Sequence, residues 1–530
     1  MGKEAGKPSR RDLLKVSAAV AGATVLQPCT LELVTSPRAG KPAGSPTPSQ
    51  KPVKARLSAK AVKATAKFDD QLPDWLPRST TKRPNVVLIV MDTTRVDHLS
   101  CYGYRRQTTP NVDAFAAGAR RYTNAISTAP WTLPSHSAMF TGLSGSAHGL
   151  NWLHQVLDKR FSTLAEQLAA IGYQTVGLSS NPLIRPATAL NRGFQTFWNS
   201  ASFGVGPIAP LMHAQLAGWL KEGYDPGKPF FLFLNYIEPH QPYSPAATHF
   251  ASDEARTWWK KQDQWGRSFD YTLTGGDSFS AKDLAELEAL YDDEVRYMDG
   301  QIGQVLRFLK STGLEESTLV AITADHGEHF GEHHCMDHQF SVYQPLVHVP
   351  LMIRHPGRLT TGKEDGLVQN HDLYPTILEW AGLDWKPLPG QNCCSLLRPS
   401  PAGRLAISEY TEPFVLALDR VATNYPDIDC SRFNCRLRAI QRGKLKLIQA
   451  GGVGCYPAFA VELYDLEEDP METHNLAHEK PEVADELAAA LDVWSGSFQH
   501  YAAGPAPPTV RPHPPSPHEL KAMRGLGYVH

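Results

Sequence analysis

Three continuous apolar runs, each followed by acidic or histidine residues, constrain the fold of this chain more than any other feature of its sequence. Runs of this length without polar alternation are typical of strands that are buried on both faces. The runs and the residues that follow them are 86–91 before Asp92, 230–234 before Glu238-Pro239-His240, and 319–323 before Asp325-His326. Strands of this kind occur in parallel sheets that are covered by helices on both faces.

Stretches with helical periodicity, such as 163–171 and 287–309, lie between these runs. Strands that alternate with helices predict an α/β fold with a mainly parallel sheet flanked by helices. In such sheets ligands bind beyond the carboxyl ends of the strands, so the polar residues after the three runs are expected to meet there. We therefore predict an α/β domain over residues 83–400, with a ligand site at this edge of its sheet.

The pattern changes after about residue 400. Residues 438–448 and 461–466 have the composition of short strands, and 481–491 of a late helix. These elements predict a smaller C-terminal subdomain over 401–530, built on an antiparallel sheet. The Pro-rich stretch 504–517 is expected to be an extended connector.

The first 35 residues have the features of an export signal. Arg10 and Arg11 precede an apolar run over 16–26, and a membrane span would need roughly 20 apolar residues. The paired arginines therefore favour a twin-arginine signal peptide over 1–35, with a basic disordered tail as the alternative. Residues 36–82 are rich in Pro, Lys, Ala and Ser and are expected to form a flexible linker.

The expected location follows from these N-terminal features. We predict that the protein is exported, either to the periplasm or to the extracellular space. Cys29 after the apolar run suggests a lipid anchor as a further alternative, although Pro28 fits a lipoprotein site poorly. No later segment is long and apolar enough to predict an integral membrane span in the mature chain.

The overall composition excludes some classes of function. The formal net charge is -2, with 42% hydrophobic and 20% charged residues. Nucleic-acid binding calls for a basic excess, so no nucleic-acid partner is expected. The 8 cysteines include no CxxC pair, which argues against a zinc finger.

Four residues could form a compact metal site at the carboxyl ends of the strands. Asp92 alone could be a helix cap, and Thr132 could cap a helix whose first turn contains Pro134. Together with Asp325 and His326, however, they combine carboxylate and imidazole ligands with a hydroxyl group. Such ligands suit one divalent cation, Zn²⁺, Mn²⁺ or Ca²⁺, which would lower the pKa of the Thr132 hydroxyl and make it a nucleophile. The helix N-terminus behind Thr132 would favour an anionic substrate.

Several longer motifs strengthen this interpretation. They are 84–95 (PNVVLIVMDTTR), 101–104 (CYGY), 108–113 (TTPNVD), 132–136 (TLPSH), 238–243 (EPHQPY), 323–328 (TADHGE), 462–466 (ELYDL) and 526–528 (LGY). In combination they resemble the sulfatase family of the alkaline phosphatase superfamily, from about Pro84 to the C-terminus. The resemblance implies an alkaline-phosphatase-like fold and a metal-dependent hydrolase of phosphoric or sulfuric esters.

The resemblance also implies roles for two histidines. His240 and His338 correspond to residues that contact the substrate, and we expect them to face the non-bridging oxygens or the leaving group from opposite sides. A second metal ion would need further ligands, and His333, His334, Asp337 and His338 are close enough in sequence to supply some.

The departures from the family pattern are equally informative. Sulfatases carry a Cys or Ser that is oxidised to formylglycine, but this chain has Thr132, which cannot be converted. His136 replaces an arginine, Thr93 replaces a second acid, and 179–182 (SSNP) replaces a Gly-Lys-Trp-His segment. The remaining set is similar to phosphoglycerol and phosphoethanolamine transferases and to phosphodiesterases of the same superfamily.

We therefore predict an enzyme that uses Thr132 to cleave phosphate mono- or diesters. The substrate would be a small-molecule, glycan-linked or lipid-linked anionic ester. The alternatives are a sulfatase that acts without formylglycine, and an inactive binding protein that has kept the fold. Bound metal in the purified protein would support an enzyme rather than the binding protein.

Overall fold

The computed structural model describes residues 68, 81, 83–200, 208–276, 278–430, 433–451 and 461–502. All of them belong to one compact unit that spans Thr65–His530. The expected signal peptide, nearly all of the expected linker and the Pro-rich stretch 504–517 lie outside the described residues.

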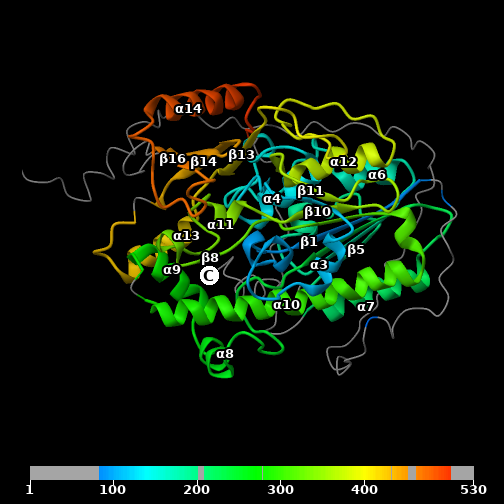
Figure 1. Cartoon of the computed structure of the whole chain (residues 1–530), viewed down its shortest axis with the longest axis horizontal. Coiled ribbons are helices and arrows are strands. Elements are labelled where there is room, and N and C mark those ends of the chain that lie inside the picture. Colours follow the sequence, from blue (N-terminus) through cyan, green and yellow to red (C-terminus); the bar gives the residue numbers. More distant parts are fainter. Residues whose placement is uncertain are drawn as a thin grey trace, which may run out of the picture. The chain divides into compact units, whose positions relative to one another are not determined.

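A mainly parallel sheet of eight strands is the centre of this unit (Figure 1). In sheet order the strands are β11 (Gly362–Glu364), β2 (Arg120–Tyr122), β10 (Leu351–Arg354), β7 (Thr318–Thr323), β1 (Asn85–Met91), β6 (Phe230–Tyr236), β4 (Gln174–Ser179) and β5 (Thr196–Asn199). The five strands from β7 to β5 are parallel, and β10 runs antiparallel to its neighbours β7 and β2. The predicted α/β fold is confirmed.

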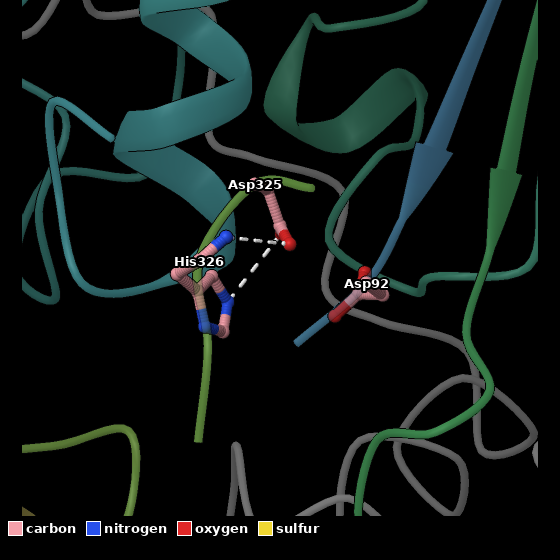
Figure 2. A group of neighbouring side chains, drawn as sticks. All are labelled: Asp92, Asp325 and His326. Atoms are coloured by element: carbon pink, nitrogen blue, oxygen red, sulfur yellow. Dashed lines mark hydrogen bonds and ion pairs between the residues drawn. The ribbon is translucent and has the colours of Figure 1, made fainter. Parts of the chain in front are cut away.

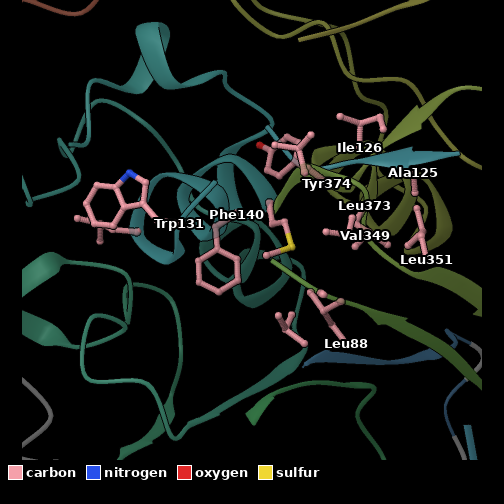
Figure 3. Packing of buried hydrophobic residues seen from close by; sticks show 14 of the residues in the cluster. Leu88, Ala125, Ile126, Trp131, Phe140, Val349, Leu351, Leu373 and Tyr374 are labelled. Atoms are coloured by element: carbon pink, nitrogen blue, oxygen red, sulfur yellow. The ribbon is translucent and has the colours of Figure 1, made fainter. Parts of the chain in front are cut away.

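Strand β1 is buried along its whole length and separates two hydrophobic cores. Its alternate side chains point to opposite faces of the sheet, because a strand has a side-chain period of two. Leu88 packs in one core with Phe140, as Figure 3 shows, whereas Val87 and Ile89 pack in the other. Both faces are therefore apolar, which explains the continuous apolar run in the sequence.

Helices cover both faces of the sheet, and Figure 1 shows α4, α6 and α12 on one side with α7 and α10 on the other. The Leu88 face is covered by α4 (Thr132–Thr141), α6 (Leu164–Ala170) and α12 (Leu373–Trp380), and the Val87 face by α3 (Pro110–Ala116), α7 (Ala209–Glu222) and α10 (Ala281–Ser311).

The helices predicted over 163–171 and 287–309 are present as α6 and α10. Helix α6 begins with a capping box, in which Thr163 and Glu166 each accept a hydrogen bond from the other's backbone N–H. Helix α10 begins earlier than predicted, because Ser280 and Asp283 form a second capping box upstream of the apolar pattern.

A second sheet, of four antiparallel strands, follows residue 400. Its elements are β13 (Leu405–Tyr410), β14 (Arg436–Arg442), β15 (Leu445–Gly451) and β16 (Val461–Asp465), with α14 (Pro481–Gly496) packed on it. The prediction of a single strand over 438–448 was wrong, because the chain turns at Gly443 (φ +59°) and pairs Arg442 with Leu445. Glycine adopts this left-handed backbone without the steric cost of a Cβ.

Smaller elements complete the described part of the unit. They are α5 (Gly145–His148), α8 (Asp253–Trp259), α9 (Gln264–Thr274), α11 (Gln344–Val347), α13 (Val415–Asn424), the pair β3 (Ala125–Ile126) and β12 (Val368–Gln369), and the hairpin β8 (His329–Phe330) and β9 (Met336–Asp337). Among the described residues, no helix has the length and apolar character that a membrane span requires.

Candidate active site

Asp92, Asp325 and His326 meet where strands β1 and β7 end (Figure 2). The two strands are parallel neighbours, and Val90 pairs with Thr323, so that the residues two positions beyond each of them emerge together. One ligand atom from each of the three side chains lies within 4.8 Å of the others, and all three residues are fully buried. The predicted convergence of these three residues is present in the structure.

Thr132 is the first residue of α4 and faces the same cluster. Its Oγ1 lies 3.3 Å from His326 Nε2. The residue that caps the helix is Trp131, whose side chain makes no capping hydrogen bond. The Thr132 hydroxyl is therefore not a helix cap and is directed at the acidic cluster.

Two asparagines that lie outside the predicted set of site residues complete this cluster. Asn181 follows β4 and donates from Nδ2 to Asp92 Oδ2 at 2.8 Å and to Thr132 Oγ1 at 3.3 Å. Asn235 in β6 donates to the same Asp92 oxygen at 3.3 Å. In the sequence, Asn235 could have been recognised as an amide at the end of an otherwise apolar run, and Asn181 by its place in the unusual segment 179–182.

The electrostatics of the cluster fit a bound cation. Burial raises the pKa of Asp92 to about 7 and holds the pKa of Asp325 well above its ordinary value. Asp92 Oδ1 has no hydrogen-bond partner among the described residues. His326 donates from Nδ1 to the Gly327 carbonyl at 2.9 Å, which leaves Nε2 as a lone-pair donor toward the cluster. Two buried carboxylates and a neutral imidazole are ligands that a divalent cation would bind and stabilise.

The loop that carries Asp325 is held from several sides. The backbone carbonyl oxygen of Asp325 accepts hydrogen bonds from Ser135 Oγ at 2.8 Å and from Asn370 Nδ2 at 3.4 Å. Asp325 Oδ1 accepts a hydrogen bond from the Thr93 backbone N–H at 3.2 Å. Thr93 has φ +49°, and its carbonyl accepts from the Tyr291 hydroxyl at 2.9 Å. Thr93 therefore contributes its backbone to the site.

His136 lies one helical turn beyond Thr132 and is fully buried. Its Nδ1 lies 3.0 Å from the Thr132 carbonyl oxygen and 3.4 Å from Asp325 Oδ2. Burial lowers the pKa of His136 to about 3. Burial therefore disfavours a positive charge at the position that carries arginine in the resembled motif.

His338 lies beside the cluster and is held by two carboxylates. Its Nδ1 is 2.5 Å from Asp337 Oδ1 and 3.3 Å from Glu328 Oε1. The pKa of His338 is raised well above its ordinary value because Asp337 and Glu328 outweigh the effect of burial, which alone would lower it. Its ring centroid lies 4.5 Å from that of His326 and 5.0 Å from that of His240. His240 and His338 are therefore adjacent to each other.

His240 differs from His338 in its protonation. Its Nδ1 lies 2.5 Å from the Gln241 carbonyl, which can only accept, so Nδ1 carries the proton and Nε2 is an acceptor. Burial lowers the pKa of His240 to about 3. The two histidines thus favour opposite hydrogen-bonding roles, His240 as an acceptor through Nε2 and His338 as a donor.

The residues considered for a second ion are only partly brought together. Asp337 and His338 lie with Glu328, one ligand atom from each being within 4.8 Å of the others. Glu328, the last residue of the 323–328 motif, was not among the residues predicted as ligands, and burial raises its pKa to about 8. His333 instead stacks on Tyr343 with 3.7 Å between ring centroids.

Comparisons with known proteins identify the family of this chain. The family model described as Sulfatase matches residues 84–383, more than half of the chain, and one described as N-sulphoglucosamine sulphohydrolase, C-terminal, matches 331–493. Arylsulfatase K of Mus musculus is 25% identical over 465 residues, 78% of this chain and 81% of that protein. The multifunctional alkaline phosphatase superfamily protein PehA of Trinickia caryophylli is 24% identical over 525 residues, 81% of this chain and 100% of that protein.

A solved structure, the phosphonate monoester hydrolase of Agrobacterium radiobacter, has the same fold. It superposes with a TM-score of 0.59 at 21% identity, over 78% of this chain and 96% of that chain. The family model covers all eight strands of the large sheet and the cluster at the strand ends. This chain therefore belongs to the sulfatase family of hydrolases.

Proposed function

We propose that this sulfatase-family hydrolase uses Thr132 as its nucleophile and cleaves phosphate mono- or diesters. The observation that carries the proposal is the environment of Thr132 Oγ1. It lies 3.3 Å from both His326 Nε2 and Asn181 Nδ2, at the N-terminus of α4, and does not serve as a helix cap. A buried hydroxyl in this position can be activated as a nucleophile for an anionic ester.

The residues that would hold one divalent metal ion are Asp92, Asp325, His326 and the Thr132 oxygen. Such an ion would lower the pKa of the Thr132 hydroxyl and offset the charge of the two carboxylates. Asn181 and Asn235 would orient Asp92 through their hydrogen bonds to Oδ2.

The reaction would consist of two displacements at phosphorus. Thr132, having released its proton to water, forms a bond from Oγ1 to phosphorus while the bond to the leaving-group oxygen breaks. The leaving oxygen takes a proton from His338, whose Nδ1 is held by Asp337 and Glu328 and whose Nε2 has no partner among the described residues. A water molecule then attacks phosphorus, returns a proton to His338, and the bond from phosphorus to Oγ1 breaks.

Threonine chemistry favours phosphorus over sulfur. Formylglycine as the hydrated aldehyde has two hydroxyls, one to attack sulfur and one to expel sulfate by re-forming the aldehyde. Thr132 has a single hydroxyl, so a sulfated threonine would have to be cleared by water attack. The second candidate, a sulfatase that acts without formylglycine, is favoured by the similarity to arylsulfatase K and by the second family model.

The test combines substrate turnover with detection of the intermediate. 4-Nitrophenyl phosphate esters should react much faster than 4-nitrophenyl sulfate, and rapid quench with intact-mass spectrometry should show a phosphate adduct on the Thr132 peptide. Thr132→Ala should lose the adduct and most activity. Ser137→Ala on the same helix removes a hydroxyl that donates to the Leu133 carbonyl, and it is the control for a change in helix structure. Faster sulfate turnover with Thr132 unmodified would instead support the sulfatase.

We also propose that the protein is exported by its twin-arginine segment and acts in the periplasm or outside the cell, with Cys29 as an alternative lipid anchor. Cys435 is disulfide-bonded, which suits an oxidising compartment. Replacing both Arg10 and Arg11 by Lys should retain the protein in the cytoplasm of the producing cells, as measured by fractionation. Unchanged export of this variant would argue against a twin-arginine signal.

A further inference from the structure

A cavity of about 700 Å³ lies beside the candidate active site without being part of it. Its walls come from residues 96–103 after β1, from the region of β2, from α11 and β11, and from residues 470–471 near the C-terminal sheet. Ligand cavities in proteins commonly measure about 300–1,000 Å³, and they occur preferentially where separate parts of a protein meet. The size and position of this cavity are therefore those of a ligand site.

Pro345 in α11 lies between the cavity and the loop that carries the metal-binding residues. It lines the cavity, and its carbonyl packs so closely on Gly327 that a Cβ atom at Gly327 could not be accommodated. The next carbonyl, of Leu346, accepts a hydrogen bond from the Gly327 backbone N–H at 2.8 Å. Among the described residues that line the cavity, none belongs to the Asp92, Asp325 and His326 cluster. A ligand in the cavity would therefore be separate from that cluster.

Part of the cavity wall is apolar. Val96, Pro345 and Met471 contribute to it, and Met471 is 41% exposed. An exposed apolar side chain at a cavity favours a ligand that removes it from water. The ring of Tyr102 also lines the cavity, and its hydroxyl is held by the Leu351 carbonyl at 3.1 Å and the Leu351 backbone N–H at 3.0 Å. The wall thus presents a fixed aromatic ring and a flexible thioether.

Two cations reach the same cavity. The guanidinium of Arg121 lies over the Tyr102 ring, with 5.3 Å from Cζ to the ring centroid, and contacts the Cys101 carbonyl. Among the described residues, Arg121 forms no ion pair with a carboxylate. Lys363 lies 3.9 Å from Asp365 Oδ1, in a pair whose two side chains are both largely exposed. Such surface pairs contribute little, so Lys363 is free to turn toward a ligand.

The polar groups of the wall leave this positive charge largely uncompensated. Asp97, the acid among the lining residues, accepts hydrogen bonds from Arg95 Nε at 2.9 Å and Nη2 at 2.8 Å. Gln344 lines the cavity too, and its buried Nε2 has no hydrogen-bond partner among the described residues. A buried donor of this kind is costly unless a ligand or a water molecule accepts its hydrogen bond. The cavity therefore offers a guanidinium and an amide donor beside an apolar wall.

We propose that this cavity is a second ligand site, which binds a small organic anion with an apolar body. Arg121 pairs with the anionic group and Gln344 donates a hydrogen bond to it. Tyr102 and Met471 cover the apolar body. A guanidinium suits this role because its planar fork can donate two parallel hydrogen bonds to one anionic group. The proposal involves neither Thr132 nor a metal ion, so it holds or fails independently of the proposed phosphoryl transfer.

The first experiment compares three probes, two of which each lack one feature of the third. Calorimetry of the unaltered protein at neutral pH measures the Kd of 2-naphthalenesulfonate, of the uncharged 2-naphthalenesulfonamide and of methanesulfonate. The naphthalenesulfonate should bind at least about tenfold more tightly than the sulfonamide, as expected for one charge-assisted hydrogen bond. It should exceed methanesulfonate by at least about tenfold as well, because methanesulfonate has little apolar surface to remove from water.

The second experiment locates the bound probe. Arg121→Gln removes the cation and keeps a polar side chain, so it should weaken binding of 2-naphthalenesulfonate by about tenfold and leave the sulfonamide affinity unchanged. Arg120→Gln is the matched control on the same strand, because Arg120 points to the opposite face, donates to the Leu396 carbonyl at 3.1 Å and does not line the cavity. This variant, and His338→Ala in the candidate active site, should bind the naphthalenesulfonate as the unaltered protein does.

Three results would overturn the proposal. The first is equal affinity for the naphthalenesulfonate and the sulfonamide, or no measurable binding of either, and this result needs no variant to fold. The second is a loss of affinity in Arg120→Gln that equals the loss in Arg121→Gln. The third is loss of binding in His338→Ala with full binding in Arg121→Gln, which would place the probe in the candidate active site.

Discussion

Lys446 is a buried cation that joins the C-terminal sheet to the segment that follows His338. It lies in β15 with 1% of its surface exposed. Its Nζ is 2.6 Å from Glu472 Oε1 and donates to the Val342 carbonyl at 2.7 Å. The second Glu472 oxygen accepts from the Gln344 backbone N–H at 2.5 Å. Burial lowers the pKa of Lys446, whereas the Glu472 carboxylate acts in the opposite direction and favours the charged lysine.

Replacing Lys446 by Met retains an unbranched apolar side chain but leaves the Glu472 carboxylate buried without its cation. Breaking a buried ion pair by removing one partner costs about 3–5 kcal/mol, so Lys446→Met should lower the free energy of unfolding by this amount. The double variant Lys446→Met with Glu472→Gln removes both charges, and Gln keeps an oxygen for the Gln344 N–H. It should recover most of the loss. Urea unfolding of the four proteins, at one protein and metal concentration, gives the coupling energy as a double-mutant cycle.

Lys444 is the matched control, because it lies in the adjacent turn and also pairs with acids. Its Nζ is 2.9 Å from Glu467 Oε2, but half of the side chain is exposed. Surface pairs contribute little, so Lys444→Met should have a much smaller effect. Equal losses in the two lysine variants, or a coupling energy near zero, would refute the assignment of this stability to the buried pair.

Three further predictions concern the site and its surroundings. Asp325→Ala should reduce the amount of bound metal per chain, as measured by elemental analysis. It should also lower activity by more than the 10–100-fold that is typical of losing a residue that only supports a metal ligand. If the variant keeps both its metal and its activity, the metal binds elsewhere. His338→Ala should lower kcat and kcat/KM together by about 10²–10⁴-fold, and unchanged kinetics in both this variant and His240→Ala would make these residues structural. Burial raises the pKa of Glu294 to about 8 from its ordinary 4.5. As the pH rises, Glu294 therefore loses its proton in the unfolded chain before it does so in the folded protein. The free energy of unfolding should fall between about pH 4.5 and about pH 8, by roughly 4–5 kcal/mol. Glu294→Gln should remove that fall in urea unfolding curves, and an identical pH dependence in variant and unaltered protein would contradict it.

The sequence alone predicted the fold class and the central ligand cluster. Runs such as 86–91 are apolar at every position, because both faces of β1 are covered. This pattern belongs to parallel sheets, whose strands all end at one edge. Asp92, Asp325 and His326 follow two such runs directly, so their convergence required no knowledge of the packing.

Only the tertiary structure decided which neutral and charged groups surround that cluster. Asn181 and Asn235 reach Asp92 from two further strands, and nothing in the local sequence determines that one amide bridges it to Thr132. Likewise, Glu328 reaches His338, ten positions further along the chain, because the hairpin of β8 and β9 lies between them. Strand ends follow from local periodicity, whereas these contacts depend on sheet order and loop path, which are set by packing between distant segments.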